Sequence, residues 1–186
     1  MGEEGEPKVK RFYAAAARDA VRVIWGEKGL ADVAARMSEA HRAAMLVPDL
    51  PQWVPERALI AFNFALWEGP VDRARPRYEK WLHTMTDMSF GVVKRLVLSM
   101  ASPEKVILVA GDMWKTDHTH GEMVGRCEGK RGTLTLSGSP YVETPQGRAG
   151  MAEMSRYILQ LAGAKGVVEK HALVPPGVLE IKLRWA

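Results

Sequence analysis

The spacing of apolar residues changes once along this chain, near Gly121. Before that point apolar side chains recur at three- and four-residue steps, which is typical of amphipathic helices. After it apolar and polar residues alternate in short runs, which is typical of antiparallel strands. The pattern predicts an α+β fold in which an N-terminal helical part is followed by strands, and it confines the strands to residues after about 120.

Capping and turn residues divide the first part into helices. Pro55 suits the first turn of one helix, and Ser102-Pro103-Glu104 supplies the cap, first residue and first-turn acid of another. Gly91 is expected to bend or split the longest of them. The expected helices cover residues 11–25, 30–45, 55–67, 76–100 and 103–114.

The second part has the order hairpin–helix–hairpin. Thr144 and Pro145 cap its helix, and the last strand places Leu179, Ile181, Leu183 and Trp185 on one side. The simplest arrangement is a four-stranded antiparallel sheet packed on helices. The expected strands cover residues 123–128, 133–137, 167–174 and 178–185.

Length and composition indicate one domain with an ordinary core. The chain has 186 residues, of which 47% are hydrophobic, and domains of this size fold alone. We expect a disordered tail over residues 1–9 and a single α+β domain over 10–186, helical over 10–117 and sheet-containing over 118–186. The single cysteine, Cys127, excludes an intramolecular disulfide.

The charge and hydropathy of the chain indicate which partners it can bind and in which cellular compartment it is expected. The net charge of +4 is spread among acidic residues, whereas nucleic-acid binders concentrate basic residues on one face. No apolar run is long enough to span a membrane, and the acidic start is not that of a secretion signal. These features predict a cytoplasmic protein that binds no nucleic acid.

The motifs of common enzymes are missing from the chain. There is no nucleophile elbow, phosphate loop or dinucleotide fingerprint. The polar residues best suited to bind a ligand are Asp117, His118 and His120, which could chelate a divalent metal ion. The alternative, which we favour, is a polar turn between helix and strand, because no third well-spaced ligand motif accompanies the histidines.

Residues 55–67 are apolar nearly all round, so this helix is expected to be buried on most sides. A ligand chamber is predicted between it and the helix that begins at Pro76. Its expected lining is Phe62, Asn63, Trp67, Trp81 and Met85. Methionine side chains repack easily around ligands, and those that could line such a pocket are Met37, Met45, Met85, Met88, Met151 and Met154. Ordinary core packing is the alternative.

Residues 55–186, which include both helices and strands, also resemble a known group of proteins. The resemblance is carried by Ser102-Pro103-Glu104 with Trp114 ahead of His118, by Ser155-Arg156-Tyr157-Ile158-Leu159, and by the terminal Leu183-Arg184-Trp185. Over residues 55–186 the chain resembles myxobacterial proteins that are related by fold to the 4-vinyl reductase and heme–nitric-oxide-binding (H-NOX-like) domains. This resemblance implies a helical layer on a four-stranded sheet and a role in binding a ligand or a partner.

The resemblance does not extend to a cofactor. Heme-binding members of the related domains use a Tyr-x-Ser-x-Arg motif for the heme propionates, and this chain has none. The cofactor therefore stays unknown, and heme is not supported by the motif.

Together these features predict a non-enzymatic regulatory or sensory domain that binds a small apolar ligand, a protein partner, or both. The first alternative is a structural interaction module such as a homodimer. The second is a metal-dependent enzyme built on Asp117, His118 and His120.

Overall fold

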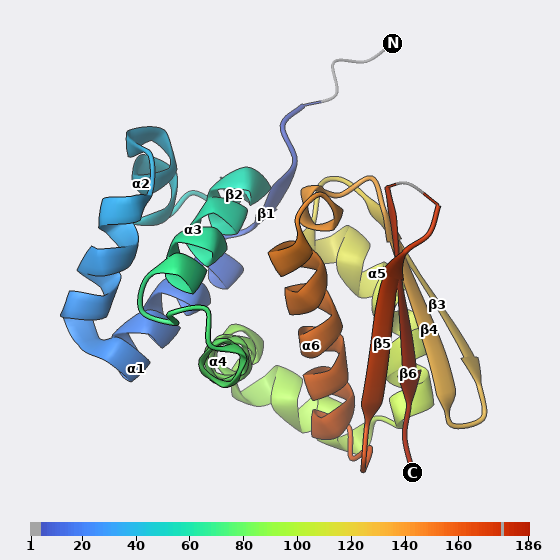
Figure 1. Ribbon diagram of the computed structural model, residues 1–186. Coiled ribbons are helices and arrows are strands. Elements are labelled where there is room, and N and C mark those ends of the chain that lie inside the picture. Colours follow the sequence, from blue (N-terminus) through green and yellow to red (C-terminus); the bar gives the residue numbers. More distant parts are fainter. Residues whose placement is uncertain (1–4, 176) are drawn as a thin grey trace.

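The chain folds into a helical part (residues 8–100) and a sheet part (residues 103–186), which lie side by side in Figure 1. The computed structural model describes residues 5–175 and 177–186, without the side chains of residues 92–95. The helical part contains β1 (Lys8–Lys10), α1 (Arg11–Arg36), α2 (Glu39–Met45), β2 (Trp53–Pro55), α3 (Glu56–Glu68) and α4 (Arg75–Met100). The sheet part contains α5 (Pro103–Asp117), β3 (Glu122–Glu128), β4 (Arg131–Ser137), the 3-10 helix η1 (Pro140–Val142), α6 (Pro145–Leu161), β5 (Val168–Leu173) and β6 (Val178–Arg184).

The predicted four-stranded antiparallel sheet is confirmed, with the strand order β3-β4-β6-β5. Leu134 pairs with Ile181 and Leu136 with Leu179, and all four side chains are buried. Their face is covered by α5 and α6. Gly125 allows α5 to lie close to β3, because a Cβ atom there would overlap the carbonyl oxygen of Ile107.

The helices largely follow the apolar pattern. The caps expected at Ser102 and Thr144 are present, since their hydroxyls accept hydrogen bonds from the backbone N–H groups of Lys105 and Gly147. The bend expected at Gly91 is also present, because this residue has φ 59° and ψ −178° inside α4. The interruption expected after Trp25 is present too, because Gly26 has φ 68° and ψ −171° inside α1. The helix expected over residues 30–45 was wrong in its extent, since α1 ends at Arg36 and α2 begins at Glu39.

The expectation that strands occur only after residue 120 was wrong. The short strands β1 and β2 pair antiparallel, with Val9 opposite Val54, and Val9 also bridges to His118. Lys8 and Val9 belong to β1 and Val9 is fully buried, so these two residues are not part of the disordered tail expected over residues 1–9. Residues 1–4 lie outside the described residues. Strands of three residues are too short to produce a recognisable alternation.

The core of the helical part is centred on Trp81 of α4. Its side chain is fully buried, and its indole Nε1–H donates a hydrogen bond of 3.1 Å to the carbonyl oxygen of Ala17 in α1. The rings of Phe62 and Tyr78 lie beside it, with centroids 6.4 and 5.6 Å away. This cluster fixes α1, α3 and α4 to one another. None of the described helices is both long enough and apolar enough to cross a membrane.

Candidate functional site: an apolar pocket between the two parts

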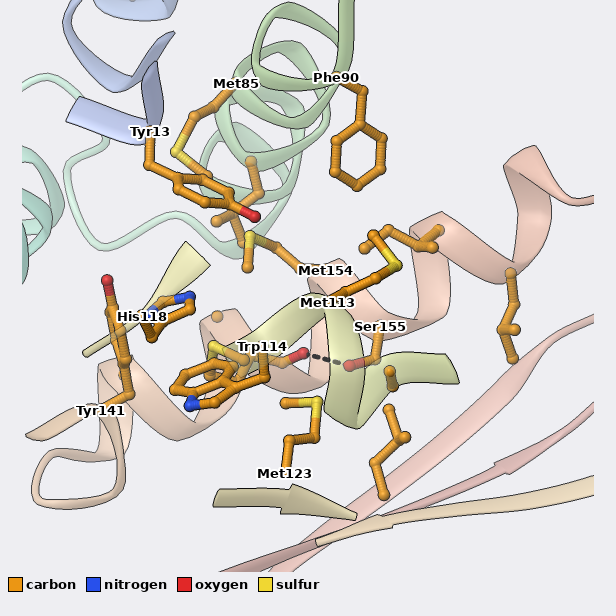
Figure 2. A pocket seen from close by; sticks show the side chains of 18 of the residues that line it. Tyr13, Met85, Phe90, Met113, Trp114, His118, Met123, Tyr141, Met154 and Ser155 are labelled. Carbon is orange, nitrogen blue, oxygen red and sulfur yellow. Dashed lines mark hydrogen bonds between the residues drawn. The ribbon is translucent and has the colours of Figure 1, made fainter. Parts of the chain in front are cut away.

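A pocket of about 130 Å³ lies where the helical part meets the sheet part. Figure 2 shows side chains converging on it from both sides. The helical part contributes residues of α1, α3 and α4, and the sheet part contributes residues of α5, α6, β3 and β4. The lining is mostly aliphatic, aromatic or methionine. It includes Met85, Met113, Met123, Met151 and Met154.

One wall of the pocket is an imidazole held by a buried carboxylate. His118 caps α5, where its backbone N–H bonds to the carbonyl of Trp114. Its ring stacks on the Trp114 indole with centroids 3.6 Å apart and planes within 1°. Its Nδ1 lies 2.7 Å from Oε1 of Glu56, the first residue of α3, whose side chain is 0% exposed. The Ser139 hydroxyl donates to the other carboxylate oxygen at 3.4 Å. These contacts fix the orientation of the ring.

Asp117, the neighbour of His118 in the chain, makes a second set of polar contacts between the two parts. The hydroxyl of Tyr13 in α1 donates a hydrogen bond of 3.1 Å to Asp117, and the ammonium of Lys10 lies 3.3 Å from the same carboxylate. Burial raises the pKa of the Tyr13 hydroxyl, and the charge and hydrogen bond of Asp117 raise it further. Tyr13 therefore keeps its proton and remains a donor.

The helices α4 and α6, which both contribute residues to the pocket, are joined to each other through Glu153. This carboxylate is buried, accepts a hydrogen bond of 2.8 Å from Nε of Arg156 and lies 2.6 Å from Nε2 of His83. His83 stacks on Tyr157, whose hydroxyl donates to Asp87. Burial alone would raise the pKa of Glu153, but the contacts with Arg156 and His83 outweigh it and hold that pKa below its usual range.

The depressed pKa of Glu153 gives stability a defined pH dependence. Because the carboxylate binds its proton more weakly in the folded state, its contribution is present at neutral pH and is lost as the pH falls below about 4.5. We expect Glu153→Gln to lower the free energy of unfolding at pH 7 by roughly 1–2 kcal/mol. Urea denaturation between pH 7 and 3 should then show a shallower loss of stability for the variant than for the wild type. The control is Glu143→Gln, which alters an exposed pair with Arg57. Parallel curves for Glu153→Gln and wild type would contradict this account.

The structure separates the three residues considered as metal ligands. Asp117 is bonded to Tyr13 and Lys10, His118 to Glu56, and Nδ1 of His120 to the Thr119 hydroxyl at 2.9 Å. Within residues 5–175 and 177–186, no group of three or more His, Cys, Asp or Glu side chains is placed to hold a metal ion. The geometry therefore gives the metal-dependent alternative no support.

The residues expected to line a ligand chamber are divided between the pocket and the core behind it. Asn63 and Met85 line the pocket. Phe62 and Trp81 pack against each other, and Trp67 packs edge-on against Tyr78. The pocket thus lies between α3 and α4 on one side and the sheet part on the other. Of the methionines singled out from the sequence, Met85, Met151 and Met154 line it.

Several lining residues were not anticipated from the sequence as ligand contacts. Tyr13, Trp114 and Tyr141 come from segments far apart in the chain. Met151 and Met154 of α6 were among the methionines that could line a pocket, but the pattern of one helix does not show which other element its apolar face contacts.

The fold just described is shared with H-NOX domains. No protein-family model matches the chain, and no curated protein matches it. Among solved structures, an Fe(II) unliganded H-NOX protein from K. algicida aligns with a TM-score of 0.67 and 10% sequence identity, covering 95% of this chain and 96% of that one. An S. oneidensis H-NOX protein in the Fe(II)NO ligation state aligns with a TM-score of 0.63 and 11% identity, covering 95% and 99%. An oxygen-binding H-NOX domain related to soluble guanylate cyclases, in its oxygen complex, aligns with a TM-score of 0.58 and 7% identity, covering 95% and 94%. At these identities the similarity establishes the fold.

The described residues of the pocket do not fit heme. The pocket measures about 130 Å³, whereas pockets for drug-sized molecules span roughly 300–1,000 Å³ and heme exceeds those molecules in size. No Lys or Arg is present among the described lining residues to pair with heme carboxylates. The carboxylate-held imidazole of His118 is an arrangement that also orients metal-bound histidines, but it does not compensate for the missing space and charge.

Proposed function

We propose that this chain is a non-enzymatic sensory domain that binds a small apolar molecule in the pocket between the helical part and the sheet part. The observation that carries the proposal is the pocket itself, which is lined mainly by apolar side chains from both parts. Small-molecule sites are typically apolar concavities with a few placed polar groups. The ligand-bound states named for the S. oneidensis H-NOX protein and the oxygen-binding H-NOX domain support a small-ligand role for this fold.

The volume of the pocket sets the size of the ligand. A dry apolar cavity of about 150 Å³ binds benzene, and the pocket here has about 130 Å³. Its natural occupant is therefore close to a single ring in size. The methionines around it can repack to follow the shape of the ligand, because the thioether chain is unbranched and flexible.

The position of the pocket explains how binding would be reported. The two parts are joined beside it by the contacts of Glu56 with His118 and of Tyr13 with Asp117, and Tyr13 and His118 both line the pocket. A ligand that contacts these side chains and binds one arrangement of the two parts more tightly shifts the population toward that arrangement. A protein partner, or a second copy of the chain, would respond to that shift by binding one of the arrangements preferentially.

A protein partner alone is the alternative function. Large apolar side chains are exposed near the end of α4 and on α5, at Leu96, Val97, Met100 and Leu108. Native mass spectrometry of the purified chain distinguishes the two functions, since it reports bound ligand and copy number together. A ligand-free dimer that ignores added apolar molecules would favour the interaction module.

The proposal predicts that benzene binds and stabilises the fold. At a hundredfold excess over its dissociation constant, a ligand raises the free energy of unfolding by about 2.7 kcal/mol. The test is a thermal-unfolding series with benzene, run on the wild type and on Ala110→Leu, which fills the pocket from α5. Ala110 lines the pocket, and the added carbons should abolish the benzene response. Leu108→Met, at an exposed position on the same helix, is the control and should respond like the wild type. Equal responses of wild type and Ala110→Leu would refute binding in this pocket.

A further inference from the structure

Two hydroxyl groups in the pocket lining have no hydrogen-bond partner among the described residues. Of the four hydroxyls that belong to described lining residues, those of Tyr13 and Ser155 donate hydrogen bonds, the second of them within α6 (Figure 2). The other two are the hydroxyls of Tyr78 and Tyr141. A buried polar group without a partner costs free energy, so each of these hydroxyls requires an explanation.

The hydroxyls of Tyr78 and Tyr141 can be contacted from the pocket. Both residues line it, and only 5% of Tyr78 and 7% of Tyr141 is exposed. In the described part of the chain, the buried side-chain atoms that are both enclosed and unpartnered are Nε of Arg18 and Oδ1 of Asn63. The two hydroxyl oxygens are not among these atoms, so each retains accessible surface that a small molecule in the pocket can reach.

The two hydroxyls come from different parts of the fold. Tyr78 belongs to α4, and its ring stacks on Trp81 with centroids 5.6 Å apart. Its oxygen lies against α6, since a Cβ atom on Gly150 would be 3.0 Å away from it. Tyr141 belongs to η1, and its ring packs edge-on against His118 with centroids 6.1 Å apart (Figure 2). The packing of both rings therefore fixes where their hydroxyls lie.

Both hydroxyls keep their protons at neutral pH. Burial raises the pKa of Tyr78. Burial also raises the pKa of Tyr141, and the neighbouring acidic groups of Glu56, Tyr13 and Tyr78 raise it further. Because electrostatic effects weaken with distance, the effect of Tyr78 on Tyr141 places the two hydroxyls in one neighbourhood. The pocket thus holds two neutral hydrogen-bond donors among apolar side chains.

We propose that the ligand of the pocket is a single-ring molecule bearing a carbonyl oxygen, which accepts hydrogen bonds from the hydroxyls of Tyr78 and Tyr141 while the ring lies among the methionines. The inference rests on the proposed function and specifies its ligand class. A carbonyl oxygen has two lone pairs and no hydrogen, so it can accept both bonds. Because one donor belongs to the helical part and the other to the sheet part, such a ligand joins the two parts across the pocket.

The test compares cyclohexanone with methylenecyclohexane, which has nearly the same shape and carries a CH₂ group in place of the oxygen. In calorimetric titrations, Tyr78→Phe and Tyr141→Phe should each weaken cyclohexanone binding by roughly five- to tenfold, the factor expected of one neutral hydrogen bond. Neither variant should weaken methylenecyclohexane binding. Tyr13→Phe is the matched control, because it removes a hydroxyl of the lining that already donates to Asp117. It should leave the ratio of the two affinities unchanged.

Infrared spectroscopy of the wild type detects the hydrogen bonds themselves. Hydrogen bonding lowers the stretching frequency of a carbonyl group, so cyclohexanone bound to excess protein should absorb at a lower frequency than cyclohexanone in hexane. In the double variant Tyr78→Phe/Tyr141→Phe the frequency of the bound ketone should return to the hexane value.

The outcomes separate this inference from the proposed function. If both tyrosine variants leave the ratio of the two affinities unchanged, or if the ketone bound to the wild type absorbs as it does in hexane, the assignment of the two donors is overturned and the apolar pocket stands. If neither probe binds, the proposed function fails and this inference fails with it. The infrared comparison with hexane needs no variant, so misfolding of a variant would not prevent a decision.

Discussion

Replacing Trp81 by alanine is expected to lower the free energy of unfolding by about 3–5 kcal/mol, the usual cost of removing a large buried aromatic side chain. Trp81 is fully buried, packs beside the rings of Phe62 and Tyr78, and donates a hydrogen bond to the Ala17 carbonyl. Its loss would create a cavity and leave that acceptor without its indole donor. Since the free energy of unfolding of a domain is only about 5–15 kcal/mol, the substitution would remove a large fraction of it. Urea denaturation followed by circular dichroism measures this loss.

Trp81→Phe is the matched control, because phenylalanine retains much of the ring packing and cannot donate the hydrogen bond. We expect it to lower the free energy of unfolding clearly less than Trp81→Ala does. The loss that remains is due to the missing hydrogen bond to Ala17 and to the smaller ring. A loss below about 1 kcal/mol for Trp81→Ala would mean that Trp81 is not at the centre of a well-packed core.

Replacing Glu56 by alanine is expected to have the second large effect, a loss of about 3 kcal/mol, because it leaves the buried partners of a polar network unpaired. Glu56 has no exposed surface, and its carboxylate contacts both the His118 ring and the Ser139 hydroxyl. These contacts join α3 of the helical part to the end of α5 and to the loop before η1. The same change should loosen the wall of the pocket that His118 forms.

A double-mutant cycle measures the interaction energy between Glu56 and His118. Glu56→Ala and His118→Phe should each destabilise the fold, and the double variant should lose less than the sum of the two, with a coupling of about 1–3 kcal/mol. Additive losses would show that Glu56 and His118 do not stabilise each other, and the proposed link between the two parts would then lack its strongest contact.

The architecture was predictable where a pattern repeats over many residues. The alternation of Leu179, Ile181 and Leu183 fixed the buried face of the last strand, and the caps at Ser102 and Thr144 marked where helices begin. The pairing of β1 with β2 was not predictable, because each strand has three residues and is held by tertiary contacts of Val9.

The site was only partly predictable, because sequence shows which residues share a helix face and not which elements face each other. Asn63 stood out as an amide in an apolar helix, and it lines the pocket. The neighbouring aromatic residues Phe62 and Trp81 carried the same signal of burial but belong to the core. The contact of Glu56 with His118 joins residues 62 positions apart in the sequence, and no local sequence pattern predicts such a pair.

Binding of a small apolar molecule in the pocket between the two parts should be detected directly at the methionines that line it. Met113, Met123 and Met154 line the pocket, whereas Met88 and Met100 are exposed on α4, Met100 with 81% of its surface accessible. Titration of benzene into protein carrying ¹³C-labelled methionine methyl groups should be followed by NMR. We expect saturable chemical-shift changes at the pocket methionines and none at Met88 and Met100. Shifts confined to the exposed methionines, or no saturable shift at all, would contradict this expectation.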